Sequence, residues 1–203
     1  MTRPPLADLH VSNLLTYVSL AAAIGASAAA RGDGGLSLSG ALLALAAVSD
    51  TFDGRFARSF KRSDRQRRIG GELDSLVDAV VFGFAPVVVL AEIPGLGTGI
   101  VGLGWWTAAF LYVLAAVTRL SAFNIEENST RFIGLPTPAV ALIWSTVLLR
   151  PPSPSVIAGL FLLCGAAMVG PITIPRPRGV GLAIFALWAV ALMVLHGAQR
   201  ITR

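Results

Sequence analysis

The chain carries, at residues 50–58, the sequence Asp50-Thr51-Phe52-Asp53-Gly54-Arg55-Phe56-Ala57-Arg58, directly after an apolar run. A second acidic pair lies in Gly71-Glu72-Leu73-Asp74-Ser75-Leu76-Val77-Asp78, which leads into another apolar run. Residues three or four apart are neighbours on a helix, so each aspartate pair occupies one helix face. Ionisable groups at the edge of a hydrocarbon phase are costly and mark functional sites. The two pairs therefore predict a site for divalent metal ions at a membrane boundary.

The composition explains why the surrounding phase is hydrocarbon. The 203 residues are 55% hydrophobic and only 13% charged, with a mean hydropathy of +0.74. A soluble protein of this size has too small a core to bury so much apolar surface. A helix that crosses a membrane, in contrast, needs about 20 apolar residues. We therefore predict an all-α integral membrane protein with six membrane helices and an additional C-terminal helix. The apolar runs lie at about 14–30, 36–52, 76–93, 100–118, 135–149, 154–172 and 179–195.

The segments between these runs are rich in proline and glycine, as in Arg150-Pro151-Pro152-Ser153-Pro154, and are typical of turns between helices. No soluble domain is evident, so the prediction is one transmembrane domain over residues 1–203, with the extra helix at about 179–196. The stretch Ala26-Ser27-Ala28 resembles a signal-peptide cleavage site, but its n-region holds only Arg3. We expect the first helix to be retained.

Basic residues predict the orientation, because they accumulate on the cytoplasmic side of a membrane. With the amino terminus inside and alternating helices, the seven basic residues of segment 55–68 lie inside together with Arg3, Arg119, Arg131, Arg176 and Arg178. Only Arg31, Arg150, Arg200 and Arg203 then lie outside. The carboxylates are thus expected at the cytoplasmic face of a cell membrane.

The second helix is expected to present one functional stripe, which runs from acids through small residues to cations. Its members are Asp50, Asp53, Gly54, Ala57, Arg58 and Lys61. The third helix is predicted to start at Gly70 or Gly71 and to present Asp74 and Asp78. The loop between the helices is strongly basic. The pattern predicts carboxylates for metals beside cations for phosphate.

Carboxylate ligands without cysteine or histidine favour Mg²⁺ or Mn²⁺. Two ions about 3.5 to 4 Å apart would clamp the attacking and leaving oxygens of a phosphoryl displacement. Neither His10, before the first helix, nor His196, at the end of the last, is placed to contribute. One of the carboxylates is then available as a general base.

The pattern Asp-x-x-Asp-Gly-x-x-Ala-Arg, followed by Gly-x-x-x-Asp-x-x-x-Asp, resembles the signature of the CDP-alcohol phosphotransferase family. The resemblance spans residues 11 to about 175. It implies a six-helix membrane enzyme, often dimeric, in which an alcohol displaces CMP from a CDP-linked donor. Residues 71–86, Arg119-Leu120-Ser121-Ala122-Phe123-Asn124 and residues 132–138 are similar to the phosphatidylserine synthase branch. That branch usually has arginine where Ala122 stands, and the segment 59–69 is three residues longer than usual.

The resemblance implies these roles. Asp50, Asp53, Asp74 and Asp78 bind two Mg²⁺ or Mn²⁺ ions, and Asp78 is also the catalytic base. Gly54, Ala57 and Arg58 bind the CDP group, with Asn13 and Thr16. Arg119 or Arg131 binds the acceptor, for which L-serine is favoured. The expected partners are CDP-diacylglycerol, membrane lipids and a second copy of the chain, with no nucleic acid.

Other interpretations remain open. The acceptor can be glycerol 3-phosphate, inositol phosphate or another small alcohol, and the donor can be ether-linked. Gly54 and Ala57 can also be small residues that let two helices pack closely. The basic loop can serve only to orient the protein in the membrane and to attract anionic lipids. Arg119 can be a residue whose side chain extends to the membrane interface. A transporter would distribute its acids through the membrane depth, whereas these cluster at one boundary. If the protein were an inactive membrane scaffold, replacing Asp78 by asparagine would leave its cellular function intact.

Overall fold

The computed structural model describes residues 8–125, 131–175 and 179–201, without the side chains of residues 131 and 132. Its described part forms antiparallel helical rods, the third of which joins α3, a π-helical segment η3 and α4. Two short strands pair with each other to form a small antiparallel sheet. The elements are η2 (Val11–Asn13), α1 (Leu14–Ala29), α2 (Gly35–Arg58), α3 (Asp64–Asp78), η3 (Ala79–Phe84), α4 (Ala85–Ala91), α5 (Gly99–Ile125), β1 (Arg131–Ile133), α6 (Thr137–Leu149), α7 (Pro154–Val169), β2 (Thr173–Pro175) and α8 (Val180–Ile201).

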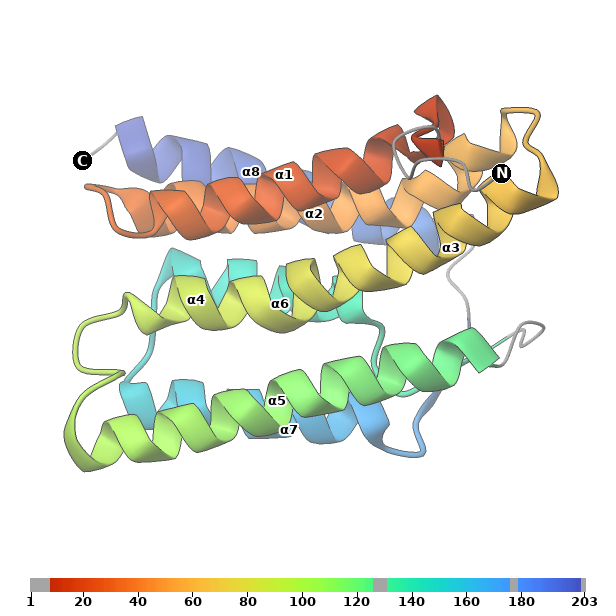
Figure 1. The fold of residues 1–203 in the computed structure, drawn as a ribbon. Helices are drawn as coiled ribbons and strands as arrows, with labels where there is room; N and C mark the ends of the chain where they lie inside the picture. Colours follow the sequence, from red (N-terminus) through yellow and green to blue (C-terminus); the bar gives the residue numbers. More distant parts are fainter. Residues whose placement is uncertain (1–7, 126–130, 176–178, 202–203) are drawn as a thin grey trace.

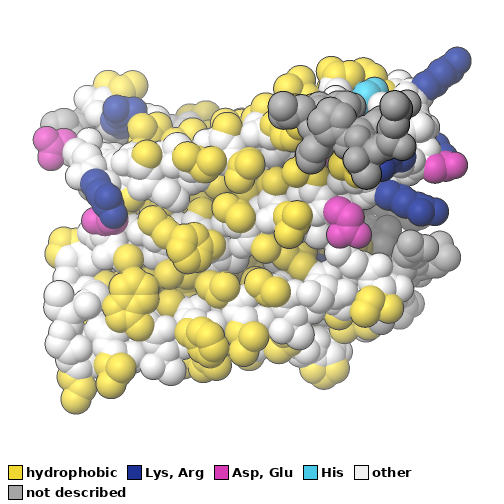
Figure 2. Space-filling view, viewed as in Figure 1, with side chains coloured by type: hydrophobic (Ala, Val, Ile, Leu, Met, Phe, Trp, Pro, Cys, Tyr) yellow, Lys and Arg dark blue, Asp and Glu magenta, His cyan; other side chains and the backbone are white. Residues whose placement is uncertain are grey.

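Five of these rods are long and apolar enough to cross a membrane, and α6 and α7 are shorter apolar helices. The 13 residues of α6 reach about 20 Å at about 1.5 Å per residue, less than a hydrocarbon core of about 30 Å. Figure 2 shows hydrophobic side chains across the middle of the visible face and charged side chains toward its two ends. The predicted all-α membrane fold with an additional C-terminal helix is confirmed.

The rods form three layers, with α1, α2 and α8 in one, the third rod and α6 in the next, and α5 and α7 in the last (Figure 1). α2 is the central element, since it packs against α1, α6 and α8. Its buried face is made of small residues that include Gly40, Ala44 and Ala47. Small residues let helix backbones approach closely, which replaces the missing hydrophobic driving force inside a membrane. The helix that carries Asp50 and Asp53 is thereby packed against three neighbours.

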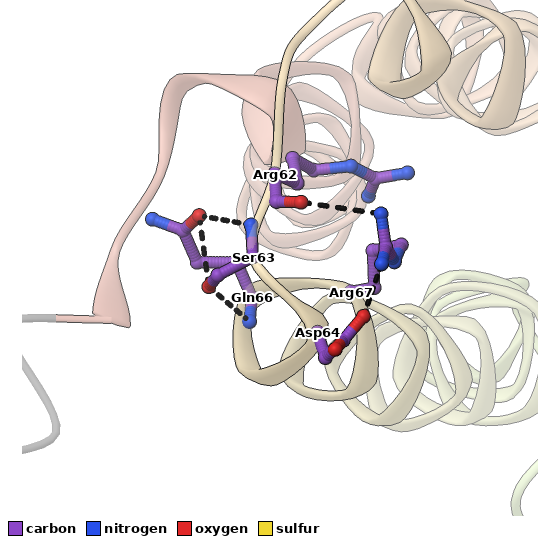
Figure 3. A network of polar contacts seen from close by, with 5 residues as sticks. All are labelled: Arg62, Ser63, Asp64, Gln66 and Arg67. Atoms are coloured by element: carbon purple, nitrogen blue, oxygen red, sulfur yellow. Dashed lines mark hydrogen bonds and ion pairs between the residues drawn. The ribbon is translucent and has the colours of Figure 1, made fainter.

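The third rod begins at Asp64. The sequence analysis had predicted its start at Gly70 or Gly71. Ser63 is the N-cap of α3, and a capping box joins its side chain and backbone to Gln66 (Figure 3). This box satisfies backbone N–H groups that a helix start leaves without partners. Because α2 ends at Arg58, Lys61 lies in the connection and not on the α2 stripe.

A π-helical segment follows Asp78 directly and had no counterpart in the sequence analysis. Pro86 lacks an N–H group and cannot donate to the carbonyl of Phe82 four residues earlier. The hydroxyl of Tyr112 on α5 donates to that oxygen at 2.5 Å, and Trp144 Nε1 on α6 donates to the same hydroxyl at 3.1 Å. The irregular turn is thus stabilised from two neighbouring helices.

The last helix is fixed to the bundle by a buried polar contact. His196 is 1% exposed, and its Nε2 lies 2.9 Å from the backbone oxygen of Ser145 on α6. A Cβ atom at Gly40 on α2 would collide with the His196 ring. The histidine therefore occupies a space that glycine leaves open.

At the opposite end, strands β1 and β2 pair antiparallel, with Phe132 opposite Ile174. Gly134 follows β1 with φ 77°, and a Cβ atom there would collide with the backbone of Met168. The chain can make this turn against α7 only because residue 134 is glycine.

Candidate active site

The end of α2 and the middle of the third rod bring the predicted carboxylates together. One carboxylate oxygen each from Asp50, Asp74 and Asp78 lies within 4.8 Å of the other two. All three side chains are half-buried. The pairs predicted on separate helices therefore form one cluster.

Asp53 completes the cluster on the side of α1. It lies within hydrogen-bonding reach of Asp74, and its Oδ2 accepts a hydrogen bond of 3.1 Å from the Thr16 hydroxyl. Thr16 thus orients one acid of the cluster, a contact that the sequence did not predict for it. All four predicted aspartates are in the site.

The cluster fits a divalent metal ion. Oδ1 of Asp74 and Oδ1 of Asp78 are buried and have no hydrogen-bond partner among the described residues. A buried acceptor without a partner costs about 1–3 kcal/mol, and more when it is charged. A cation bound between them would remove that cost and the mutual repulsion of the carboxylates. Because the donors are all hard oxygens, the set suits Mg²⁺ or Mn²⁺.

A pocket of about 200 Å³ lies beside the carboxylates. Its walls are formed by the segment before α1, the first turn of α1, the last turns of α2, the connection to α3 and the first turns of α3. All five residues predicted to bind the CDP group, Asn13, Thr16, Gly54, Ala57 and Arg58, line it. The remaining lining residues are Ser12, Asp53, Arg62, Arg67, Gly70, Gly71 and Asp74.

Small residues keep this pocket open. A Cβ atom at Gly54 would meet only Arg58 Nη1, at 3.7 Å, so no packing partner requires glycine at that position. A Cβ atom at Gly70 would lie 3.1 Å from Asn13 Oδ1, which is a tight contact. Gly54 is therefore not explained by helix packing within this chain, whereas Gly70 permits the close approach of the N-terminal segment.

The sequence analysis left open whether the arginines of the basic loop bind phosphate or only set the membrane topology, and two of them lie in the pocket wall. Arg62 and Arg67 both line the pocket, and Figure 3 shows Arg62 on the segment that leads into α3 and Arg67 on the first turn of α3. Arg67 donates to the backbone oxygen of Arg62 at 3.2 Å and pairs with Asp64. Arg67, Gly70, Gly71 and Asp74 follow helical spacing, so the stripe argument used for α2 would have found Arg67. It was missed because the helix was expected to begin at the glycines.

Of the two arginines predicted to bind the acceptor, Arg119 faces the carboxylates from α5. It is 8% exposed, its Nη1 lies 3.5 Å from the Thr137 hydroxyl, and its charge interacts with Asp78 and Asp50. This burial is incompatible with a side chain that snorkels to the interface. The side chain of Arg131 lies outside the described residues, and only its backbone is placed, in β1.

A further contact joins the two helices that carry these groups. The Ser75 hydroxyl donates to Asn124 Oδ1 at 3.0 Å. Ser75 directly follows Asp74 on α3, and Asn124 lies near the end of α5. This hydrogen bond links the helix of the carboxylates to the helix of Arg119.

Comparison with known proteins is consistent with this geometry. A family model described as CDP-alcohol phosphatidyltransferase matches residues 9–195. The match extends over most of α8, beyond the segment in which the resemblance was recognised from motifs.

Three relatives illustrate the similarity. A CDP-diacylglycerol–serine O-phosphatidyltransferase of Mycobacterium tuberculosis strain H37Rv is 40% identical over 110 residues, which are 50% of this chain and 36% of that protein. One from Helicobacter pylori strain J99 is 31% identical over 167 residues, 76% of this chain and 68% of that protein. An archaetidylserine synthase of Methanothermobacter thermautotrophicus is 31% identical over 153 residues, 73% and 63% of the two chains. The chain thus spans about a third of the mycobacterial relative that it matches.

Proposed function

Because the chain belongs to the CDP-alcohol phosphatidyltransferase family, we propose that it transfers the phosphatidyl group of CDP-diacylglycerol to the hydroxyl of L-serine. The products are phosphatidylserine and CMP. The observation that carries the proposal is the cluster of Asp50, Asp74 and Asp78, joined by Asp53, beside a pocket lined by arginines and small residues. The names of the relatives support serine as the acceptor.

The pocket is assigned to the CDP part of the donor. Gly54 and Ala57 leave space for the nucleotide against the backbone of α2, and Asn13 and Thr16 add polar contacts from the N-terminal side. Arg58 contributes positive charge for the diphosphate, and Arg62 and Arg67 contribute it from the opposite wall. Fixing the donor between two helix ends aligns its phosphorus for attack.

Asp50, Asp53, Asp74 and Asp78 are assigned to hold two Mg²⁺ or Mn²⁺ ions. When bound, such ions neutralise the diphosphate and stabilise the charge that develops on it. Asp78 also takes the proton of the acceptor hydroxyl. The hydroxyl oxygen then forms a bond to the phosphorus that carries diacylglycerol, the bond from that phosphorus to the CMP oxygen breaks, and CMP leaves with the electron pair.

The acceptor site is assigned to Arg119, whose buried guanidinium next to the carboxylates is a cation of the kind that binds the carboxylate of serine. Arg131 stays a second candidate on the basis of sequence alone. Ala122, where serine synthases usually have arginine, makes the acceptor the main point to test. The similarity to an archaetidylserine synthase leaves an ether-linked donor as another outcome of the same test.

Topology and assembly are part of the proposal. Residues 1–203 are taken as one transmembrane domain in the plasma membrane. The active site is assigned to the cytoplasmic face, because Lys61, Arg65 and Arg68 are exposed at the carboxylate end of the bundle. A homodimer surrounded by membrane lipids is the expected assembly.

Purified protein in lipid nanodiscs tests the reaction. It is supplied with CDP-diacylglycerol, Mg²⁺ or Mn²⁺, and a panel of acceptors that includes serine, glycerol 3-phosphate and inositol phosphate. We expect CMP release with serine, formation of phosphatidylserine, and neither with Asp78→Asn. Product from another acceptor alone would overturn the assignment of serine, and cation flux without CMP release would support a transporter.

A further inference from the structure

We infer that an ion pair between Asp8 and Arg65 positions one wall of the donor pocket, and that it thereby sets the affinity for the CDP group. This inference rests on the proposed function, because it concerns the same pocket. The wall in question is the segment of residues 8–13, here called the N-terminal strap. Asp8 and Arg65 are positioning residues, since neither lines the pocket.

The ion pair has the geometry of a strong, two-pronged contact. Arg65 Nε donates to Asp8 Oδ1 at 2.9 Å, and Arg65 Nη2 donates to Asp8 Oδ2 at 2.6 Å. The Asp8 side chain is only 9% exposed, whereas that of Arg65 is 57% exposed. Two parallel charge-assisted hydrogen bonds fix both distance and direction, unlike a single ion pair at a surface. Arg65 lies in the first turn of α3, so the strap is attached to the helix that forms the facing wall.

The strap can transmit this attachment because it is internally hydrogen-bonded. The backbone N–H of Ser12 donates to His10 Nδ1 at 3.2 Å, and that of Asn13 donates to the His10 carbonyl at 3.0 Å. The Ser12 hydroxyl donates to Asn13 Oδ1 at 3.2 Å. These bonds hold residues 10–13 together, and Asp8 lies only two residues before His10 in the chain. We therefore expect a displacement of Asp8 to displace Ser12 and Asn13, which both line the pocket.

The strap has a buried polar side and an exposed apolar side. Asp8, Ser12 and Asn13 are buried, whereas Leu9 and Val11 are 59% and 54% exposed. The buried side faces α3, where Gly70 lies close to Asn13. Chain segments outside the first helix fray unless something ties them down. The ion pair supplies that tie and preorganises the pocket, which lowers the entropic cost of binding the donor.

The experiment measures binding and turnover separately in the full chain. The dissociation constant of a short-chain CDP-diacylglycerol is measured with Mg²⁺ for the unchanged protein, Asp8→Ala, Arg65→Ala and the double variant, together with KM and kcat for CMP release. We expect each single variant to weaken binding about fivefold, a loss typical of a charge-assisted hydrogen-bond pair. The double variant should lose less affinity than the sum of the two single losses, because both single variants remove the ion pair. KM should rise with kcat unchanged.

The controls separate positioning from loss of structure. Arg68→Ala removes the same charge from the same helix at an exposed position outside the pocket, and should leave binding unchanged. The exchange Asp8→Arg with Arg65→Asp should restore at least half of the lost affinity. Binding that is unchanged in Asp8→Ala and Arg65→Ala would overturn the inference, as would an equal loss in Arg68→Ala.

The same data distinguish the two proposals. CMP release by the unchanged protein, with binding unaffected by the variants, leaves the function intact and overturns the ion pair's role. Binding that depends on the ion pair, without CMP release from any acceptor, overturns the function and supports the ion pair. Absence of donor binding in the unchanged protein overturns both.

Discussion

Replacing Tyr112 by phenylalanine tests how the irregular turn after Asp78 is held. The substitution keeps the ring, which packs against Phe161 with ring centroids 4.7 Å apart, and removes only the hydroxyl. It leaves the Phe82 carbonyl and Trp144 Nε1 without their hydrogen bonds of 2.5 and 3.1 Å. A buried polar group without a partner costs about 1–3 kcal/mol, so we expect about 3 kcal/mol in all. For a chain of this length, that lowers the midpoint of thermal unfolding by about 6–12 °C.

The assay is thermal unfolding of the purified protein in one detergent, followed by a thiol-reactive dye at the buried Cys164. Tyr17→Phe is the matched control, because its buried hydroxyl has no hydrogen-bond partner among the described residues. The control should unfold within about 2 °C of the unchanged protein, the size of effect expected where no interaction is lost. If Tyr112→Phe unfolds like the control, the reasoning about Pro86 and the freed carbonyl is wrong. Lower turnover should accompany the loss of stability, since the π-helical segment begins at Ala79.

Four other predictions concern the site and one turn. Asp78→Asn should lower CMP release by about 10²- to 10⁴-fold, the usual contribution of a general base, while the protein still elutes as a folded species in size-exclusion chromatography. Chelation with EDTA should abolish CMP release, and added Mg²⁺ or Mn²⁺ should restore it; activity that survives chelation would contradict the metal assignment. Gly54→Ala should not lower the unfolding midpoint, because a Cβ atom meets only Arg58 Nη1 at 3.7 Å and alanine favours a helix more than glycine does, yet it should raise KM for the donor; an unchanged KM would argue against a nucleotide at that position. Gly134→Ala should lower the unfolding midpoint, because φ is 77° and the Cβ atom would collide with Met168; the strain is about 1–3 kcal/mol, and an unshifted midpoint would show that the turn can relax.

Much of the site could be predicted because its chemistry is local in sequence. Asp50 and Asp53 share a helix face by spacing alone, as do Asp74 and Asp78. The alternation of apolar runs and turns then brings the two helix ends to the same membrane boundary. The pocket residues Gly54, Ala57 and Arg58 were found for the same reason, since they continue the stripe that starts at the acids.

The missed features depend on contacts between distant residues. The π-helical segment needs a donor from Tyr112, which lies 30 positions after Phe82. Arg67 was missed because the start of α3 depends on the capping pair of Ser63 and Gln66. A search for apolar runs does not detect this polar pair, so the helix was predicted to begin after Arg67. The role of Arg65 depends on Asp8, 57 positions away. No spacing rule connects such pairs.

The sequence by itself therefore determined the membrane fold, the alternating helices and the four carboxylates. Hydropathy and helical spacing act over a few residues, so they can be recognised without knowing which helices are neighbours. Only the tertiary structure decided that Asp50, Asp74 and Asp78 form one cluster, that Arg119 faces it, and that the strap forms one wall of the pocket. These facts depend on how α1, α2, the third rod and α5 pack, and that packing follows from small residues and single hydrogen bonds between helices. Inside a membrane those contacts, more than hydrophobicity, select the arrangement of helices.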